Sequence, residues 1–224
     1  MHEQANKIQF HRNKADFCAI TVKCSRADIY PPQQPPTTNQ QPATKHMDHL
    51  AIPSFSRTGH LNAVIEIPAG TNTKYEYDKQ RLEFKPDVRD GRTRRVDFLS
   101  YPVNYGFVPS TKMVKARGGD GDPLDVLVLA EHLPTGTVIE VQPIGLLMLK
   151  DLGEWDNKVL AIPVDVSQRI IRATNWREFQ QEYSAARHII ELFFIYYDGL
   201  GTMTLMGWDD ESAALEEVKK WQLV

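Results

Sequence analysis

The chain has 224 residues, 42% of them hydrophobic and 25% charged, which is ordinary for a globular protein with one substantial core. Its formal net charge of −3 at pH 7 argues against nucleic-acid binding, which needs a basic surface to neutralise phosphates. The only two cysteines, Cys18 and Cys24, lie near the N-terminus, so we expect no disulfide framework in the core, as suits a reducing cytoplasm. No apolar run approaches the roughly 20 residues that a membrane-spanning helix needs.

Residues 1–46 differ in composition from the rest of the chain. The Pro/Gln/Thr tract at residues 30–44 has too few apolar side chains to pack a core, which predicts a disordered Pro/Gln-rich extension over residues 1–46. A globular domain is then expected over residues 47–224. Two interpretations of the extension stay open: a tail for targeting or partner binding, or a mis-called start codon with Met47 as the true first residue.

The globular part opens with two expected strands, at residues 63–68 and 74–78, with a turn at residues 70–72. Period-two alternation places Lys74 and Glu76 on one face of the second strand and the neighbouring tyrosines on the other. A basic loop with four arginines follows at residues 87–95. One guanidinium group can donate two parallel hydrogen bonds to the oxygens of a phosphate. A charged face and a charged loop of this kind are also ordinary solvated surface.

The turn at residues 118–125, Gly-Gly-Asp-Gly-Asp-Pro-Leu-Asp, holds three carboxylates and runs directly into the apolar residues 126–129. The unbroken apolar run predicts a strand buried on both faces, which would anchor the turn. Converging carboxylates repel one another unless a cation neutralises them, and their hard oxygen atoms suit Mg²⁺ or Mn²⁺. The simpler alternative is a polar loop. An EF-hand is excluded because Asp125 occupies the position that requires glycine, and a P-loop is excluded because no Gly-Lys-Ser/Thr follows.

A second acidic loop follows a β-rich stretch, with Asp151, Asp156 and Lys158 inside eight residues. Taken alone, this pattern is typical of a solvated loop. Beyond it, apolar residues recur at three- and four-residue steps and predict a long helix from about Trp176 to Tyr197, followed by a terminal helix over residues 209–221.

The motif Asp-x-Asp-Pro-x-Asp at residues 120–125 closely resembles the signature of the family I soluble inorganic pyrophosphatases. The resemblance extends over residues 60–221. It includes Ile-Glu-Ile-Pro followed by Lys-Tyr-Glu, the block Tyr-Pro-Val-Asn-Tyr-Gly-Phe at residues 101–107, and the spacing of the second acidic loop. It implies an α+β fold, in which an OB-like twisted five-stranded β-barrel is flanked by two C-terminal helices. It also implies Mg²⁺-dependent hydrolysis of inorganic diphosphate, with Mn²⁺ or another divalent ion as alternatives, and a homo-oligomer that is a hexamer in bacterial relatives.

The resemblance also implies roles for twelve side chains. The metal ions would be held by Asp120, Asp125, Asp151 and Asp156, and Asp122 would orient or deprotonate the attacking water. Phosphate would be bound by Lys74, Arg94, Tyr105, Lys158 and Tyr197, while Glu66 and Glu76 would support the network of metal and water. Arg94 is favoured among the loop arginines by its distance to the next motif, and the other three are expected to be surface charges.

One position departs from the family pattern, because relatives generally carry a lysine after the tyrosine and this chain has Asp198. A carboxylate about 6–8 Å from the substrate would oppose its charge by ~2 kcal/mol at an effective dielectric near 20. Two interpretations of this position stay open. Either the chain is a weakened relative that only binds metal and phosphate, or Asp198 faces solvent while a cation from the loop Arg89–Arg95 supplies the charge. A separate rival class is an OB-like oligonucleotide binder, and the net charge and the carboxylates argue against it.

Overall fold

The structure is a computed structural model and describes residues 47–223; the predictions for residues 1–46 lie outside this range. Its strands are β1 (Leu61–Ile67), β2 (Tyr75–Asp78), β3 (Glu83–Pro86), β4 (Val88–Arg89), β5 (Arg92–Thr93), β6 (Asn104–Phe107), β7 (Asp125–Val128), β8 (Val138–Asp151), β9 (Glu154–Trp155), β10 (Lys158–Pro163) and β11 (Met203–Asp209). The helices are α1 (Trp176–Glu182), α2 (Ser184–Tyr196) and α3 (Glu211–Trp221), with short 3-10 turns η1 (His49–Ala51), η2 (Lys115–Arg117) and η3 (Val166–Gln168).

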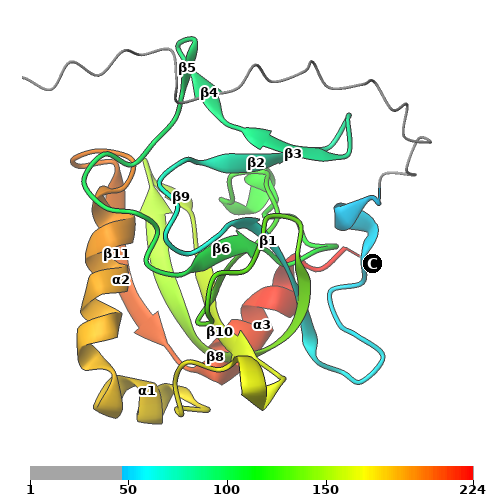
Figure 1. Cartoon of the computed structure of the whole chain (residues 1–224), viewed down its shortest axis with the longest axis vertical. Helices are drawn as coiled ribbons and strands as arrows, with labels where there is room; N and C mark the ends of the chain where they lie inside the picture. Colours follow the sequence, from blue (N-terminus) through cyan, green and yellow to red (C-terminus); the bar gives the residue numbers. More distant parts are fainter. Residues whose placement is uncertain (1–46, 224) are drawn as a thin grey trace, which may run out of the picture. The chain divides into compact units, whose positions relative to one another are not determined.

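Five strands close into a barrel. The hydrogen-bonded order is β1-β6-β7-β10-β8, and a further pairing of β8 with β1 completes the ring. β7 and β10 run parallel, and the other neighbours in the ring are antiparallel. β11 adds to the outer part of the long strand β8, and the hairpins β2–β3 and β4–β5 stand beyond one end of the barrel (Figure 1). The predicted OB-like five-stranded barrel is therefore confirmed.

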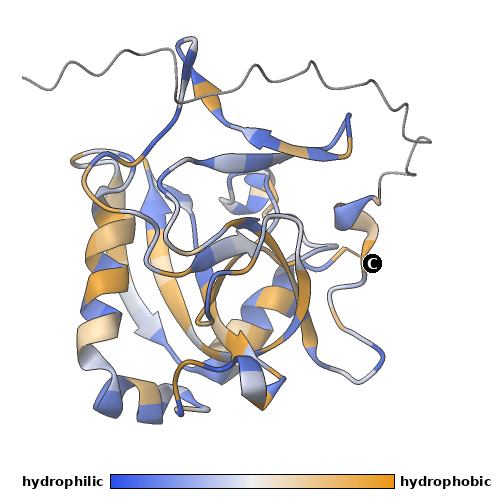
Figure 2. Cartoon of the chain, in the orientation of Figure 1, coloured by the Kyte–Doolittle hydropathy of each residue, from blue (hydrophilic) through white to orange (hydrophobic). Residues whose placement is uncertain are grey.

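The neighbouring strands β7 and β10 are buried on both faces, which explains their apolar runs at residues 126–128 and 159–163. Along β7, Leu127 belongs to the core cluster beneath α1 and α2, whereas Val126 and Val128 belong to the cluster that packs against α3. All three side chains are inaccessible to solvent. Hydrophobic segments accordingly gather on the barrel strands and on α2 in Figure 2. The rigid strand that the sequence predicts behind the carboxylate turn is present.

The C-terminal helices differ in detail from the prediction. The expected helix from Trp176 to Tyr197 is interrupted at Tyr183, whose backbone leaves the helical region with φ −123° and ψ 34°. The Tyr183 ring stacks on Phe179, and its hydroxyl accepts a hydrogen bond from the backbone N–H of Arg172 at 3.0 Å. The apolar stripe continues across this break, so its period alone does not reveal it. Residues 47–223 therefore contain three flanking helices, because the first of the two helices predicted from the sequence is divided into α1 and α2.

The first described residues are fastened to the domain. The hydroxyl of Tyr77 donates to the carbonyl of Met47 at 3.2 Å, and the buried hydroxyl of Ser54 donates to the carbonyl of Pro109 at 2.7 Å. Leu50 packs against a small cluster that contains Tyr77. Within residues 47–223, no helix combines the length and apolar character that crossing a membrane requires.

Candidate active site

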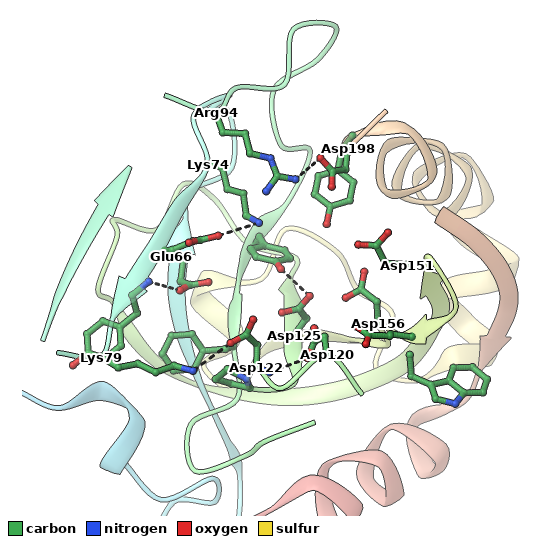
Figure 3. Close-up of a pocket in the computed structure, with 18 of the residues that line it drawn as sticks. Glu66, Lys74, Lys79, Arg94, Asp120, Asp122, Asp125, Asp151, Asp156 and Asp198 are labelled. Carbon is green, nitrogen blue, oxygen red and sulfur yellow. Dashed lines mark hydrogen bonds and ion pairs between the residues drawn. The ribbon is translucent and has the colours of Figure 1, made fainter. Parts of the chain in front are cut away.

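A cavity of about 340 Å³ opens beside the barrel, between the carboxylate turn, the second acidic loop and the two hairpins. Eleven of the twelve side chains singled out from the sequence line it: Glu66, Lys74, Glu76, Arg94, Tyr105, Asp120, Asp122, Asp125, Asp151, Asp156 and Tyr197. Figure 3 shows aspartates from both acidic loops turned into the same space, with Lys74 and Arg94 on the opposite side. The fold thus brings together residues that lie up to 131 positions apart in the sequence.

The carboxylate turn is shaped by close backbone packing. A Cβ atom at Gly119 would lie 2.6 Å from the carbonyl oxygen of Met113, so only glycine fits there. The backbone N–H of Asp122 donates to Oδ1 of Asp120 at 2.9 Å, which orients the Asp120 carboxylate. Asp125 is the first residue of β7 and so is held by the barrel itself. Two of the three carboxylates are therefore fixed by the local fold, whereas the side chain of Asp122 is 71% exposed.

Lys158 is the one predicted residue that does not line the cavity. Its side chain is fully buried, and its ammonium donates to Asp125 Oδ2 at 2.6 Å and to Asp156 Oδ1 at 2.8 Å. Asp125 Oδ2 also accepts from the hydroxyl of Tyr105 at 2.7 Å. Lys158 therefore lies beneath the cavity as a counter-ion that two carboxylates share.

The pKa values of this buried group follow from that arrangement. Burial alone would lower the pKa of Lys158, but the charges of Asp125 and Asp156 outweigh it and hold the pKa well above its ordinary value. Burial, reinforced by the charge of Asp125, raises the pKa of Asp156 despite its contact with the ammonium. The two directions are compatible, because one positive charge cannot neutralise two carboxylates.

Other carboxyl groups in the cavity also resist ionisation. Burial raises the pKa of Asp120 to about 6, with the charges of Asp125 and Asp122 adding to the effect and the N–H of Asp122 opposing it. Burial likewise raises the pKa of Glu66 to about 8, although its carboxylate accepts a hydrogen bond from the N–H of Tyr77. Burial thus opposes the ionisation of both carboxyl groups, and a nearby cation would favour it.

The acidic side suits a divalent ion. Oδ1 of Asp151 is buried and has no hydrogen-bond partner within residues 47–223, and carboxylate oxygens are the ligands that hard cations prefer. As the side chains stand, no three Asp, Glu, His or Cys groups in that range are close enough together to hold an ion. Lys158 donates to oxygens of both Asp125 and Asp156, and Tyr105 donates to Asp125. The donor set therefore fits a metal ion, which would compete with the lysine for these oxygens.

The opposite wall carries cations, each within an ion pair. Lys74 lies 3.2 Å from Glu76, and Lys79 lies 3.2 Å from Asp122. Arg94 donates to Asp87 at 3.0 Å and also contacts Asp198; the Arg94–Asp198 contact is marked in Figure 3. Asp198 does not face solvent, so that part of the alternative drawn from the sequence is wrong.

Six further charged or aromatic residues, not singled out from the sequence, line the cavity: Tyr77, Lys79, Arg89, Phe107, Glu154 and Trp155. Glu154 and Trp155 lie inside the second acidic loop, and their position there was a usable signal. Lys79 follows the charged strand β2 by one residue. For Arg89, the sequence offered only a choice among four loop arginines.

Comparisons with known proteins agree with this geometry. A family model described as inorganic pyrophosphatase matches residues 63–223. An inorganic pyrophosphatase of Saccharolobus solfataricus is 37% identical over 174 residues, covering 75% of this chain and 93% of the relative. One from Synechocystis is 36% identical over 184 residues, covering 78% and 96%.

Solved structures show the same relationship. The crystal structure of an inorganic pyrophosphatase from Thermus thermophilus superposes with a TM-score of 0.65 at 32% identity, covering 77% of this chain and 95% of that one. An inorganic pyrophosphatase from Coxiella burnetii gives a TM-score of 0.64 at 33% identity, covering 76% and 97%. With the fold, the two acidic loops and the matched residues in agreement, this chain belongs to the metal-dependent family I inorganic pyrophosphatases.

Proposed function

We propose that this chain hydrolyses inorganic diphosphate to two phosphates with Mg²⁺ as its metal ion. The observation that carries the proposal is a single cavity with carboxylates of both acidic loops on one side and Lys74 and Arg94 on the other. A substrate that is a dense anion, delivered with divalent cations, needs both kinds of surface. Membership of the inorganic pyrophosphatase family names the substrate.

We assign the metal ions to four carboxylates: Asp120, Asp125, Asp151 and Asp156. When bound, such ions supply a water of lowered pKa and offset the negative charge of the phosphate oxygens. Asp122 is the most exposed carboxylate of its turn, and this exposure suits a group that orients the attacking water and accepts its proton. Lys79 lies 3.2 Å from this carboxylate.

We assign the phosphate groups of the substrate to Lys74, Arg94, Tyr105 and Tyr197, which supply ammonium, guanidinium and hydroxyl donors to the cavity. Lys158 belongs to the same set by resemblance, and in this structure it acts from beneath the cavity through Asp125 and Asp156. Glu66 and Glu76 line the same cavity, with Glu76 paired to Lys74 at 3.2 Å, and would order water around the metal ions.

Phosphate release from diphosphate, measured with Mg²⁺, with Mn²⁺ and with a chelator, tests the proposal. We expect turnover that depends on the divalent ion. Asp125→Asn is the matched variant, because it removes a charge while keeping the size of the side chain. It should fold and lose at least ~10³-fold in rate, the scale expected on removing a metal-bound charge-stabilising group. Near-normal turnover by Asp125→Asn would contradict the assignment of the metal site.

A relative that binds metal and phosphate without turnover is the alternative function. Its one supporting feature in the sequence was Asp198, on the ground that a negative charge replaces a positive one. In the structure this carboxylate contacts Arg94 and Arg89, so it brings two cations to the cavity wall. The alternative thereby loses its support.

We also propose that the chain forms a homo-oligomer, a hexamer by resemblance. Ile189, Leu192 and Tyr196 lie three and four positions apart on α2 and are 50%, 56% and 44% exposed, which marks an apolar strip on the outer face of the helix. Light scattering coupled to size-exclusion chromatography tests this, and a monomer at micromolar concentration would contradict it.

We place the protein in the cytoplasm and expect neither a membrane nor a nucleic-acid partner. The net charge of −3 and the absence of cysteines after Cys24 support this placement. Cell fractionation tests it directly.

A further inference from the structure

Four charged side chains cluster where the hairpin β4–β5 meets the residue after Tyr197: Asp87, Arg89, Arg94 and Asp198. Oδ1 of Asp198 lies 3.1 Å from Nη1 of Arg89 and also contacts Nη2 of Arg94. The other terminal nitrogen of Arg94 donates to Asp87 at 3.0 Å. One carboxylate oxygen thus joins two guanidinium groups, one from the last residue of β4 and one from the residue that follows β5.

The two arginines differ in the number of ion-pair partners and in exposure to solvent. Arg94 is held between two carboxylates and its side chain is only 16% exposed. Arg89 has Asp198 as its single ion-pair partner in the described part of the chain, and its side chain is 59% exposed. A guanidinium carries five N–H donors in a rigid fork, so Arg89 retains most of its donors for another anion.

The position of Arg89 directs these donors toward the cavity. Arg89 is among the residues that line it, whereas Arg92, its direct partner across the β4–β5 pair, is not. The side chain of Arg89 is anchored at one point by a carboxylate that is only 15% exposed. This anchor reduces the conformational entropy that a free surface arginine would lose on binding an anion.

The charge balance of the cavity makes an additional cation useful. Nine carboxylates line it, against four cationic side chains, Lys74, Lys79, Arg89 and Arg94. Lys74 and Lys79 are each paired with a cavity carboxylate, Glu76 or Asp122, which partly offsets their charge. Arg89 is the exposed member of the Arg89–Asp198 pair and donates to Asp198 through Nη1, so its remaining N–H groups can reach a phosphate oxygen while the pair is kept.

We propose that Arg89 binds a phosphate group of the diphosphate, and that Asp198 is the positioning residue that holds Arg89 and Arg94 at the cavity wall. The inference rests on the proposed diphosphatase function and adds to it a substrate-binding residue supplied by the β4–β5 hairpin. It also accounts for a carboxylate beside an anionic substrate: the negative charge orients two positive ones.

The test compares Arg89→Ala with Arg92→Ala, which removes the same charge from the same hairpin without touching the cavity. KM and kcat are measured with Mg²⁺ and diphosphate across a salt series, and binding of inorganic phosphate to the Mg²⁺-loaded protein is measured by calorimetry. Arg89→Ala should raise KM and weaken phosphate binding about fivefold to tenfold, with kcat changed less than about twofold, since a charge-assisted contact is lost. The effect should shrink as salt rises.

Arg92→Ala should behave as the unmodified chain in both measurements. Arg89→Lys should recover part of the loss, because it restores the charge but not the fork. If Arg89→Ala and Arg92→Ala are indistinguishable in an active enzyme, the inference is overturned while the proposed function stands. If the unmodified chain releases no phosphate with any divalent ion, the proposed function fails, whatever the variants do in the binding experiment.

Discussion

Replacing Lys158 by methionine tests the buried centre of the site most directly. Methionine fills a similar volume, so the change removes a charge with little change in packing. Asp125 and Asp156 would lose an ammonium at 2.6 and 2.8 Å and be left facing each other in a buried position. Removing one partner of a buried ion pair costs about 3–5 kcal/mol.

Here we expect the lower end of that range, since both carboxylates also reach the cavity and can be partly solvated from it. About 3 kcal/mol corresponds to a fall in Tm of roughly 6–12 °C for a domain of this size. Because a divalent ion can neutralise the same carboxylates, Mg²⁺ should raise the Tm of the variant more than that of the unmodified protein.

The assay is thermal unfolding with EDTA and with Mg²⁺, with Lys112→Met as the control. Lys112 is an exposed lysine outside the cavity, so its loss should move Tm by no more than about 2 °C. If Lys158→Met in EDTA unfolds at the same temperature as Lys112→Met, Lys158 is not the counter-ion of the two aspartates. An equal response of both variants to Mg²⁺ would refute the coupling between lysine and metal.

Three further outcomes are expected. A chain that starts at Met47 should keep its activity and its Tm, and a shift of several degrees would show that residues 1–46 stabilise the domain, since ~1 kcal/mol is worth a few degrees. The pKa of Glu66 is raised from 4.5 to about 8, so the folded state binds this proton more tightly than the unfolded state. The free energy of unfolding without metal should therefore fall as pH rises between these two values. The fall is at most ~5 kcal/mol, and roughly half of that because the cavity is open to water. Glu66→Gln should therefore be more stable than the unmodified protein at pH 8 but not at pH 4.5 in urea unfolding with EDTA, and an equal difference at both values would count against the shift. Asp198→Lys should raise KM several-fold, because it removes the carboxylate that holds Arg89 and one of the two that hold Arg94, and places a like charge beside them. A KM that falls, most at low salt, would instead support reasoning from charge alone.

The sequence alone determined the features that depend on short spacing. The carboxylate turn and the strand β7 behind it occupy consecutive residues, so their composition shows both a rigid anchor and a cluster of oxygen ligands. The apolar runs of β7 and β10 likewise follow from burial on two faces. Eleven of the twelve side chains chosen by spacing and family resemblance line one cavity, although their roles stay proposals.

Other features were decided only by the tertiary structure. Lys158 is buried because β10 pairs in parallel with β7 in a register that places Lys158 opposite Asp125, 33 positions away. Arg89 and Asp198 meet across 109 positions, where local composition carries no information about partners. A lysine, an arginine or an aspartate on its own is consistent with a solvated surface, and its electrostatic role is set by the charges that strand register and packing bring within about 4 Å.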